Sequence, residues 1–292
     1  MFKRICRVSN RRARILVGLL LIGMLALGAL TGNPVEADKA PSEIAVVVAG
    51  QQIGQSSDRV VNRLETLARR QGHVALLKHL AARAERYSDY RCTFTKQERI
   101  DGTLHDEQTI DVTFRNKPFS VGMKWVKNAP RGDRVLFIEG RYGGKMLVRP
   151  SGYLARKFVP TALRKPDGPD AMKSTLRPVS RFGFRRSIQS LIDVYELAAS
   201  RGELREEVAG YAELDGRKTL VLHRYLPERP DYPAALTKIY IDVDYQVPVM
   251  VEGYGWADEE FICRYRFSDL KFNLGLADKD FDLANFDLVD PR

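Results

Sequence analysis

The chain has 292 residues, which allows one large domain or two small ones and is ample for a hydrophobic core without disulfide or metal support. With 44% hydrophobic and 29% charged residues, it is neither a disordered nor a collagen-like chain. Three cysteines and four histidines, none at a metal-ligand spacing, exclude a disulfide-dense module and a four-cysteine zinc ribbon. No metal and no cofactor is expected.

The first 30 residues have the pattern of an export signal. Six basic residues and no acidic one precede an uncharged stretch, ILVGLLLIGMLALGAL at 15–30. This stretch is shorter than the roughly 20 residues of a membrane span. Residues 1–37 are therefore predicted to be either a signal cleaved after Ala37 or an N-terminal membrane anchor. In both cases the positive-inside rule places the rest of the chain outside the cytoplasm, in the periplasm or cell envelope.

The net charge of +10 owes much to this leader. Six of the 47 basic residues lie in 1–30, so 41 basic and 37 acidic residues remain in the rest of the chain. The basic pI is therefore weak support for nucleic-acid binding, and no nucleic acid is expected as a partner of an exported chain. Residues 38–56 are predicted to be a linker and 57–292 a single domain.

Helical and strand periodicities alternate along this domain. Apolar residues at helical spacing predict two helices, or one helix kinked at Gly72, over 57–87, with His73 and His79 on solvated faces. Another helix is predicted to end at Arg201-Gly202. Five strands are expected between 90 and 149, and five more lie near 204–213, 217–226, 235–243, 247–255 and 260–272. Asp-Gly pairs at 101–102 and 215–216 predict hairpin turns.

Three groups of residues resemble a known family. They are DYRCTFTKQER at 89–99, NKPFSV at 116–121 with Trp125, and YRFSDLKFNLGLADKDFD at 265–282. Together they are similar to the exported domain-of-unknown-function family 1571 over roughly 58–290. The resemblance implies an α+β fold like that of the LolA-type periplasmic lipoprotein carriers. Such a fold is a curved antiparallel sheet of about ten strands, an unclosed barrel with helices covering its concave face.

The resemblance also implies a function. It points to a non-enzymatic cell-envelope protein that binds a hydrophobic ligand, namely an acyl chain, a lipid or a lipoprotein, in a cavity on the concave face. The alternative is a structural or adaptor protein that docks on an anionic envelope polymer, a membrane surface or a protein partner. The candidate cavity residues, each of which would also suit an ordinary core, are Phe114, Phe119, Met123, Trp125 and Phe137.

No motif in the chain indicates an enzyme. A nucleophile elbow, a P-loop and a dinucleotide fingerprint are all missing from the sequence. Glu98 stands among Lys96, Gln97 and Arg99 and could be a carboxylate tuned by cations, but charge pairing on a sheet explains it better. The glycine-rich stretch 140–144 is predicted to be a hairpin turn rather than a phosphate cradle.

Residues 150–186 interrupt the strand pattern with five prolines and a strong positive charge. Counted with Arg149, this basic segment has ten basic and two acidic residues. It is predicted to be mostly loop, either simply solvated or binding an anionic lipid or envelope polymer. The candidate residues for an anionic surface are Arg156, Lys157, Arg164, Lys165, Arg181, Arg185 and Arg186.

Cys92 and Cys263 are the two cysteines outside the leader. Both share a strand face with aromatic residues and are expected to point toward the apolar side. An exported compartment permits a disulfide between them, and the alternative is two separate buried thiols. The sequence leaves both open, because a bridge requires Cα atoms within about 7 Å and the neighbouring strands are unknown.

Overall fold

The computed structural model describes residues 55–291, so the predicted leader and nearly all of the predicted linker lie outside the described residues. The α-helices are α1 (Gln55–Ala84), α2 (Tyr153–Phe158), α3 (Pro169–Met172) and α4 (Phe184–Ser200), and the 3-10 helices are η1 (Tyr142–Gly144), η2 (Val179–Arg181), η3 (Asp278–Phe281) and η4 (Leu283–Phe286). The strands are β1 (Asp89–Ile100), β2 (Thr103–Leu104), β3 (Gln108–Arg115), β4 (Ser120–Lys127), β5 (Gly132–Ile138), β6 (Met146–Pro150), β7 (Ala162–Arg164), β8 (Arg205–Leu214), β9 (Arg217–Tyr225), β10 (Leu236–Asp242), β11 (Val247–Tyr254) and β12 (Phe261–Phe272). Within 55–291, no helix is long and apolar enough to cross a membrane.

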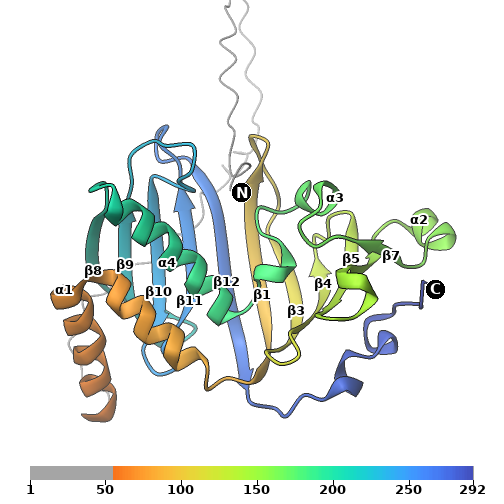
Figure 1. Ribbon diagram of the computed structural model, residues 1–292, viewed down its shortest axis with the longest axis horizontal. Helices are drawn as coiled ribbons and strands as arrows, with labels where there is room; N and C mark the ends of the chain where they lie inside the picture. Colours follow the sequence, from red (N-terminus) through yellow and green to blue (C-terminus); the bar gives the residue numbers. More distant parts are fainter. Residues whose placement is uncertain (1–54, 292) are drawn as a thin grey trace, which may run out of the picture.

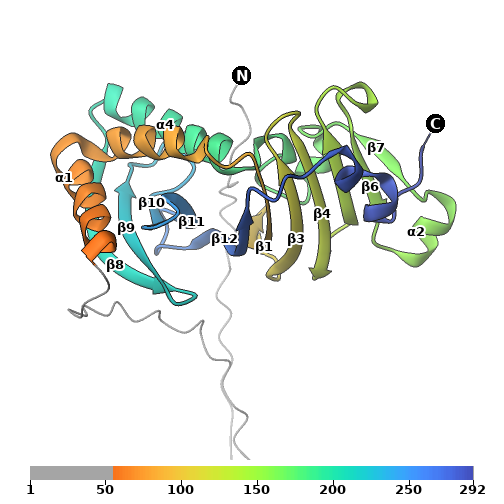
Figure 2. The same ribbon diagram turned by 90° about the horizontal axis from the view of Figure 1, so that it is seen from below.

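All the strands belong to one curved sheet (Figures 1 and 2). The order is β7-β6-β5-β4-β3-β1-β12-β11-β10-β9-β8, with β2 paired only to β1, and neighbours run antiparallel. The long strands β1 and β12 lie side by side and join an N-terminal meander to a C-terminal one. Strands β7 and β8 form the two edges, so the sheet is not closed. The predicted α+β fold is confirmed, with twelve strands rather than about ten because β2 and β7 are very short.

The turns and the kink follow the glycine signals in the sequence. At 101–102 and 215–216, aspartate and glycine both have positive φ, as a two-residue hairpin turn requires. Gly72, at φ 83° and ψ 167°, breaks α1 into two helical halves. This left-handed backbone suits glycine, which has no Cβ to clash. The predicted kinked helix is therefore confirmed.

The C-terminal half of α1 and most of α4 cover the concave face of strands β8 to β12 (Figure 2). Leu76, Leu77 and Leu80 of α1 are fully buried, as are Ile188 and Tyr195 of α4. Full burial of one such aliphatic side chain contributes about 1.5–3 kcal/mol. These contacts hold the two helices on the sheet and leave the N-terminal meander to be covered by other parts of the chain.

The prediction that His73 lies on a solvated face is wrong. Its side chain is only 1% exposed, and its Nδ1 atom lies 3.2 Å from the hydroxyl of Tyr195. Its backbone N–H donates to the Glu206 carboxylate at 3.2 Å. Burial above all, aided by the nearby Arg224, lowers the pKa of His73 to about 4, so the imidazole is neutral. The kink at Gly72 turns this position inward, which helical periodicity does not reveal.

The C-terminal tail covers the outer face of the N-terminal meander. Its apolar side chains pack against outward-facing residues of β5 and β6, and this cluster consists of Leu136, Ile138, Leu147, Leu276, Phe281, Phe286 and Leu288. Phe281 and Phe286 are each 2% exposed, so both rings hold the tail on the sheet. Gly122 of β4 lies directly under the Phe286 ring, since a Cβ there would be 2.0 Å from Cζ of Phe286. The tail thus requires glycine at this position.

The strand register excludes a disulfide between Cys92 and Cys263. Cys263 pairs with Glu98, six positions along β1 from Cys92. At the rise of a strand, six residues span about 20 Å, far beyond the reach of a disulfide. Both side chains are buried on the apolar side, as predicted, and burial raises the pKa of the Cys92 thiol. The alternative of two separate buried thiols therefore holds.

Candidate functional site: an apolar cavity under the basic segment

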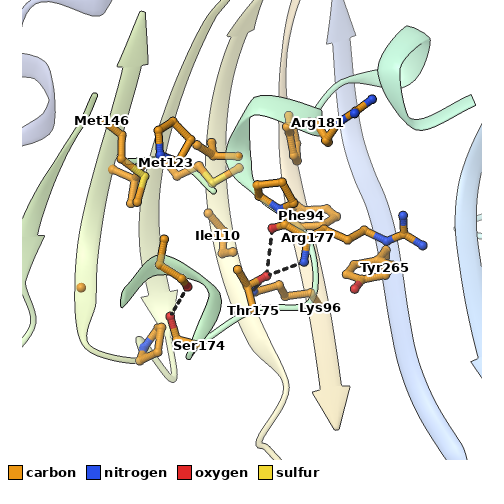
Figure 3. Close-up of a pocket in the computed structure, with 18 of the residues that line it drawn as sticks. Phe94, Lys96, Ile110, Met123, Met146, Ser174, Thr175, Arg177, Arg181 and Tyr265 are labelled. Atoms are coloured by element: carbon orange, nitrogen blue, oxygen red, sulfur yellow. Dashed lines mark hydrogen bonds between the residues drawn. The ribbon is translucent and has the colours of Figure 1, made fainter. Parts of the chain in front are cut away.

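A cavity of about 470 Å³ lies between the concave face of the sheet and the chain from β7 to the first turns of α4 (Figure 3). The sheet contributes apolar side chains that point inward from β1, β3, β4, β5 and β6, namely Phe94, Ile110, Met123, Val135 and Met146. The covering segment contributes Pro166, Ala171, Val179, Phe182 and Leu191. The volume falls within the range of about 300–1,000 Å³ that is usual for small-molecule sites.

The rim of the cavity is positively charged. Five of the residues that line the cavity are exposed to solvent: Arg131, Arg164, Asp170, Arg177 and Arg181. Arg164 and Asp170 approach each other only to 3.8 Å, and their side chains are about half exposed or more. Four arginines against one aspartate concentrate positive charge around an apolar interior. Such a rim attracts anions and offers guanidinium groups that hydrogen bond to them.

A buried carboxylate ties the covering segment to the sheet. Glu98, 1% exposed, receives a salt bridge from Lys96 Nζ at 2.9 Å. Its other oxygen, Oε1, accepts the backbone N–H of Leu176 at 3.1 Å and the hydroxyl of Tyr265 at 2.6 Å. Lys96 also donates to Oγ1 of Thr175 at 3.1 Å. We call this group of five residues the Glu98 clamp, since it holds residues 175–176 against β1 and β12.

The clamp lies at the polar end of the cavity beside an arginine. The guanidinium of Arg177 lies over the Tyr265 ring, 5.3 Å from its centroid (Figure 3). Burial first, and then the Glu98 carboxylate, raise the pKa of Tyr265 well above its usual value, so the hydroxyl stays protonated and donates. The cavity therefore has an apolar interior, a neutralised ion pair at one end and arginine side chains near its mouth.

The predicted cavity residues divide into two groups. Met123 and Trp125 line the cavity, and the Trp125 indole N–H donates to Gln108 at 2.8 Å. Phe114, Phe119 and Phe137 do not line it. The centroid of the Phe119 ring lies 5.6 Å from that of Phe114 and 5.8 Å from that of Phe137, and each of the three side chains is less than a tenth exposed. They form core beside the cavity, the alternative that the sequence also allowed.

Sequence reasoning missed the Glu98 clamp. Glu98 pairs with a cation, as expected, but the partner Lys96 lies on the same strand and the pair is buried on the concave face. A signal was present, because Cys92, Phe94, Lys96 and Glu98 share one strand parity, so Lys96 and Glu98 continue the apolar face of β1. Within 55–291, no group of three or more His, Cys, Asp or Glu side chains could hold a metal ion.

The seven predicted surface cations are spread along the basic segment. Arg164 and Arg181 lie at the cavity rim, Lys165 is exposed next to Arg164, and Lys157 is exposed on α2. The other three have protein partners: Arg156 contacts Ser151 and Asp133, Arg185 lies 3.8 Å from Glu85, and Arg186 stacks on Phe119. Turns and loops join the short elements α2, β7, α3 and η2 within this segment.

The fold and the cavity define an open antiparallel-sheet protein with an apolar pocket on its concave face. The chain belongs to the family described as "Protein of unknown function (DUF1571)", which residues 87–288 match. No curated protein matches the chain significantly.

Solved structures show similar folds at low sequence identity. A MucB structure is 15% identical with a TM-score of 0.44, over 70% of this chain and 61% of MucB. The Mycobacterium tuberculosis lipoprotein LppX is 15% identical with a TM-score of 0.38, over 68% and 98% of the two chains. A LolA superfamily protein from Nitrosomonas europaea is 10% identical with a TM-score of 0.29, over 70% and 96%. The chain thus spans about three fifths of the MucB chain.

Proposed function

We propose that this protein is a non-enzymatic, exported binding protein that holds the acyl chain of an anionic amphiphile, such as a lipid or the lipid of a lipoprotein, in its cavity. The observation that carries the proposal is an apolar cavity whose exposed rim has four arginines and one aspartate. The apolar interior suits a hydrocarbon chain, and the rim suits a carboxylate or phosphate headgroup. The leader pattern at 1–30 supports a location in the cell envelope, where such amphiphiles occur.

The expected binding energy is sufficient for such a role. Transfer of one methylene group out of water contributes about 0.8 kcal/mol, so about ten buried methylenes contribute about 8 kcal/mol. Loss of translational and conformational freedom offsets part of this gain. Charge-assisted hydrogen bonds at the rim add selectivity for the headgroup. A long-chain anion should therefore bind more tightly than an uncharged molecule with the same chain.

The test is a titration with cis-parinaric acid, a fluorescent long-chain carboxylate. Replacing both Arg177 and Arg181 by glutamine is expected to weaken its binding about tenfold, because two rim guanidiniums lose their charge. The affinity for an uncharged long-chain alcohol, measured by competition, should stay within about twofold of that of the original protein.

The matched control is Arg185→Gln, which removes an exposed cation on α4 that does not line the cavity. Unchanged binding by Arg185→Gln together with weaker binding by the double variant supports the rim as the headgroup site. Equal effects of the two changes would mean that the rim arginines act only by general electrostatic attraction and do not form a headgroup site. A protein that takes up neither probe would contradict the proposed function itself.

A further inference from the structure

The short helix α2 carries the most exposed large apolar side chains of the described chain. Tyr153 is 80% exposed, Phe158 79% and Leu154 68%, and Val159, just after the helix, is 45% exposed. Figure 1 shows α2 projecting at one end of the molecule, beyond the edge strand β7. An aromatic and aliphatic surface of this kind on a projecting element marks an interaction site rather than scattered surface residues.

The polar side of α2 fixes the helix to the sheet. Arg156 points back toward the protein, where Nη2 donates to the Ser151 carbonyl and lies 3.6 Å from a carboxylate oxygen of Asp133. Arg149 of β6 holds the same carboxylate at 2.9 and 3.0 Å. Burial raises the pKa of Asp133, but the arginines outweigh burial, so the net shift is downward and the anchor stays charged. Because Arg156 anchors one side of α2 to the protein, the apolar side chains on its other side stay exposed to solvent.

The exposed charge around α2 is of one sign. Residues 151–166, SGYLARKFVPTALRKP, contain four basic residues and no acidic one. With Arg156 turned inward, Lys157, Arg164 and Lys165 are the exposed cations of this stretch, and only Arg164 has a nearby acid, Asp170 at 3.8 Å. The β4–β5 turn, which contains the exposed Arg131, lies beside this stretch, because the Ser151 N–H donates to the Arg131 carbonyl at 3.0 Å. Cations therefore flank the apolar side chains.

We propose that α2 inserts its apolar side chains into the interface of an anionic lipid bilayer. Tyrosine and phenylalanine beside lysine are the residues that prefer the headgroup region, and apolar insertion combined with cationic attraction gives stable binding. A six-residue helix offers far less than the roughly 800 Å² per partner of a stable protein interface. The surface we infer, called the α2 tip, consists of Tyr153, Leu154, Lys157, Phe158 and Val159.

The α2 tip lies next to the cavity in the chain. Pro150, just before α2, and Ala162 and Arg164, just after it, all line the cavity. A bilayer that holds the α2 tip would therefore lie next to the rim arginines. This inference adds a membrane contact to the proposed function, and the contact itself depends on the surface of α2 rather than on the cavity.

The experiment uses the full chain with Phe158→Trp and vesicles whose acyl chains are brominated to quench tryptophan on contact. We expect strong quenching in phosphatidylcholine mixed with phosphatidylglycerol and weak quenching in phosphatidylcholine alone, because anionic lipid attracts the tip. Adding Lys157→Gln and Lys165→Gln should reduce the quenching by more than half. The control is Leu274→Trp, at an apolar residue that is 45% exposed outside α2, which should stay unquenched. The native Trp125 and Trp256 are present in every variant, so the quenching is read as the difference from the original chain, and this difference separates the tip from any binding by residues 1–54.

Equal quenching in both vesicle types, or quenching unaffected by the lysine changes, would overturn the electrostatic docking. Absence of quenching accompanied by self-association of the chain would assign the α2 tip to a second copy instead, and would also overturn it. The lysine variant should still bind cis-parinaric acid in vesicle-free solution with unchanged affinity. Failure of the membrane contact is thus distinguished from failure of the cavity.

Discussion

Replacing Glu98 by glutamine is expected to lower the free energy of unfolding by about 3–5 kcal/mol, the usual cost of removing one partner of a buried ion pair. Lys96 is only 7% exposed, so its charge would remain buried without a counter-ion. The Leu176 N–H would also face a weaker acceptor. Chemical denaturation measures the loss, and amide hydrogen exchange at Leu176 should become faster as the covering segment loosens.

The control for this prediction adds Lys96→Met to Glu98→Gln. The double variant removes the stranded charge, and replacement of a buried pair by groups of similar size is often nearly neutral. It should therefore regain most of the lost stability. If Glu98→Gln alone costs less than about 1 kcal/mol, in the range of an exposed pair, the Glu98 clamp does not hold the segment.

Gly122→Ala is expected to destabilise the protein by about 3–5 kcal/mol, similar to Phe286→Ala, because one added methyl group expels the Phe286 ring from the outer face. The Cβ atom would lie 2.0 Å from that ring, and Phe286 is 2% exposed in the native state. Alanine otherwise fits a strand at this position, since Gly122 is not among the residues with positive φ. Thermal or denaturant unfolding of the single variants measures the two losses.

A double-mutant cycle isolates the cause. Once Phe286→Ala has removed the ring, Gly122→Ala should cost almost nothing, so the two losses should not add. Additive losses would contradict the close packing of the C-terminal tail on β4.

The alternation of side chains predicted the strands well because each strand has one buried face. The five strands of the C-terminal meander were placed to within about two residues at their ends. Strand periodicity also assigned Phe114, Phe119 and Met123 to the same inward face. It could not separate the cavity from the core, because that depends on what packs above each residue. The covering segment leaves space over Met123, which therefore lines the cavity. Phe114 and Arg186 instead pack against the Phe119 ring, which therefore belongs to the core.

Charge was harder to interpret from sequence than apolar pattern. Ten cations in one segment suggested a single surface, yet the folded chain uses Arg156 and Arg186 as internal supports. Charge pairing on the sheet was expected for Glu98, but the burial of the pair was not, because buried ion pairs are uncommon. The choice between a disulfide and two thiols at Cys92 and Cys263 stayed open for a different reason, since two cysteines on neighbouring strands can lie far apart along the strand direction. Register along β1, which composition cannot supply, separates them.

The measurement that tests the central claim most directly is the number of acyl-bearing molecules extracted per chain from purified protein. It is compared between the original protein and a variant whose cavity is filled by larger side chains. Ser187 and Ala171 line the cavity from α4 and α3, and Ser187→Phe with Ala171→Phe places two rings inside it. Gln189→Phe adds a ring to the exposed face of α4 as the control. We predict about one more acyl-bearing anion per chain in the original protein and the control than in the filled variant, since one pocket holds one chain. Equal amounts in all three proteins would contradict an acyl-binding cavity.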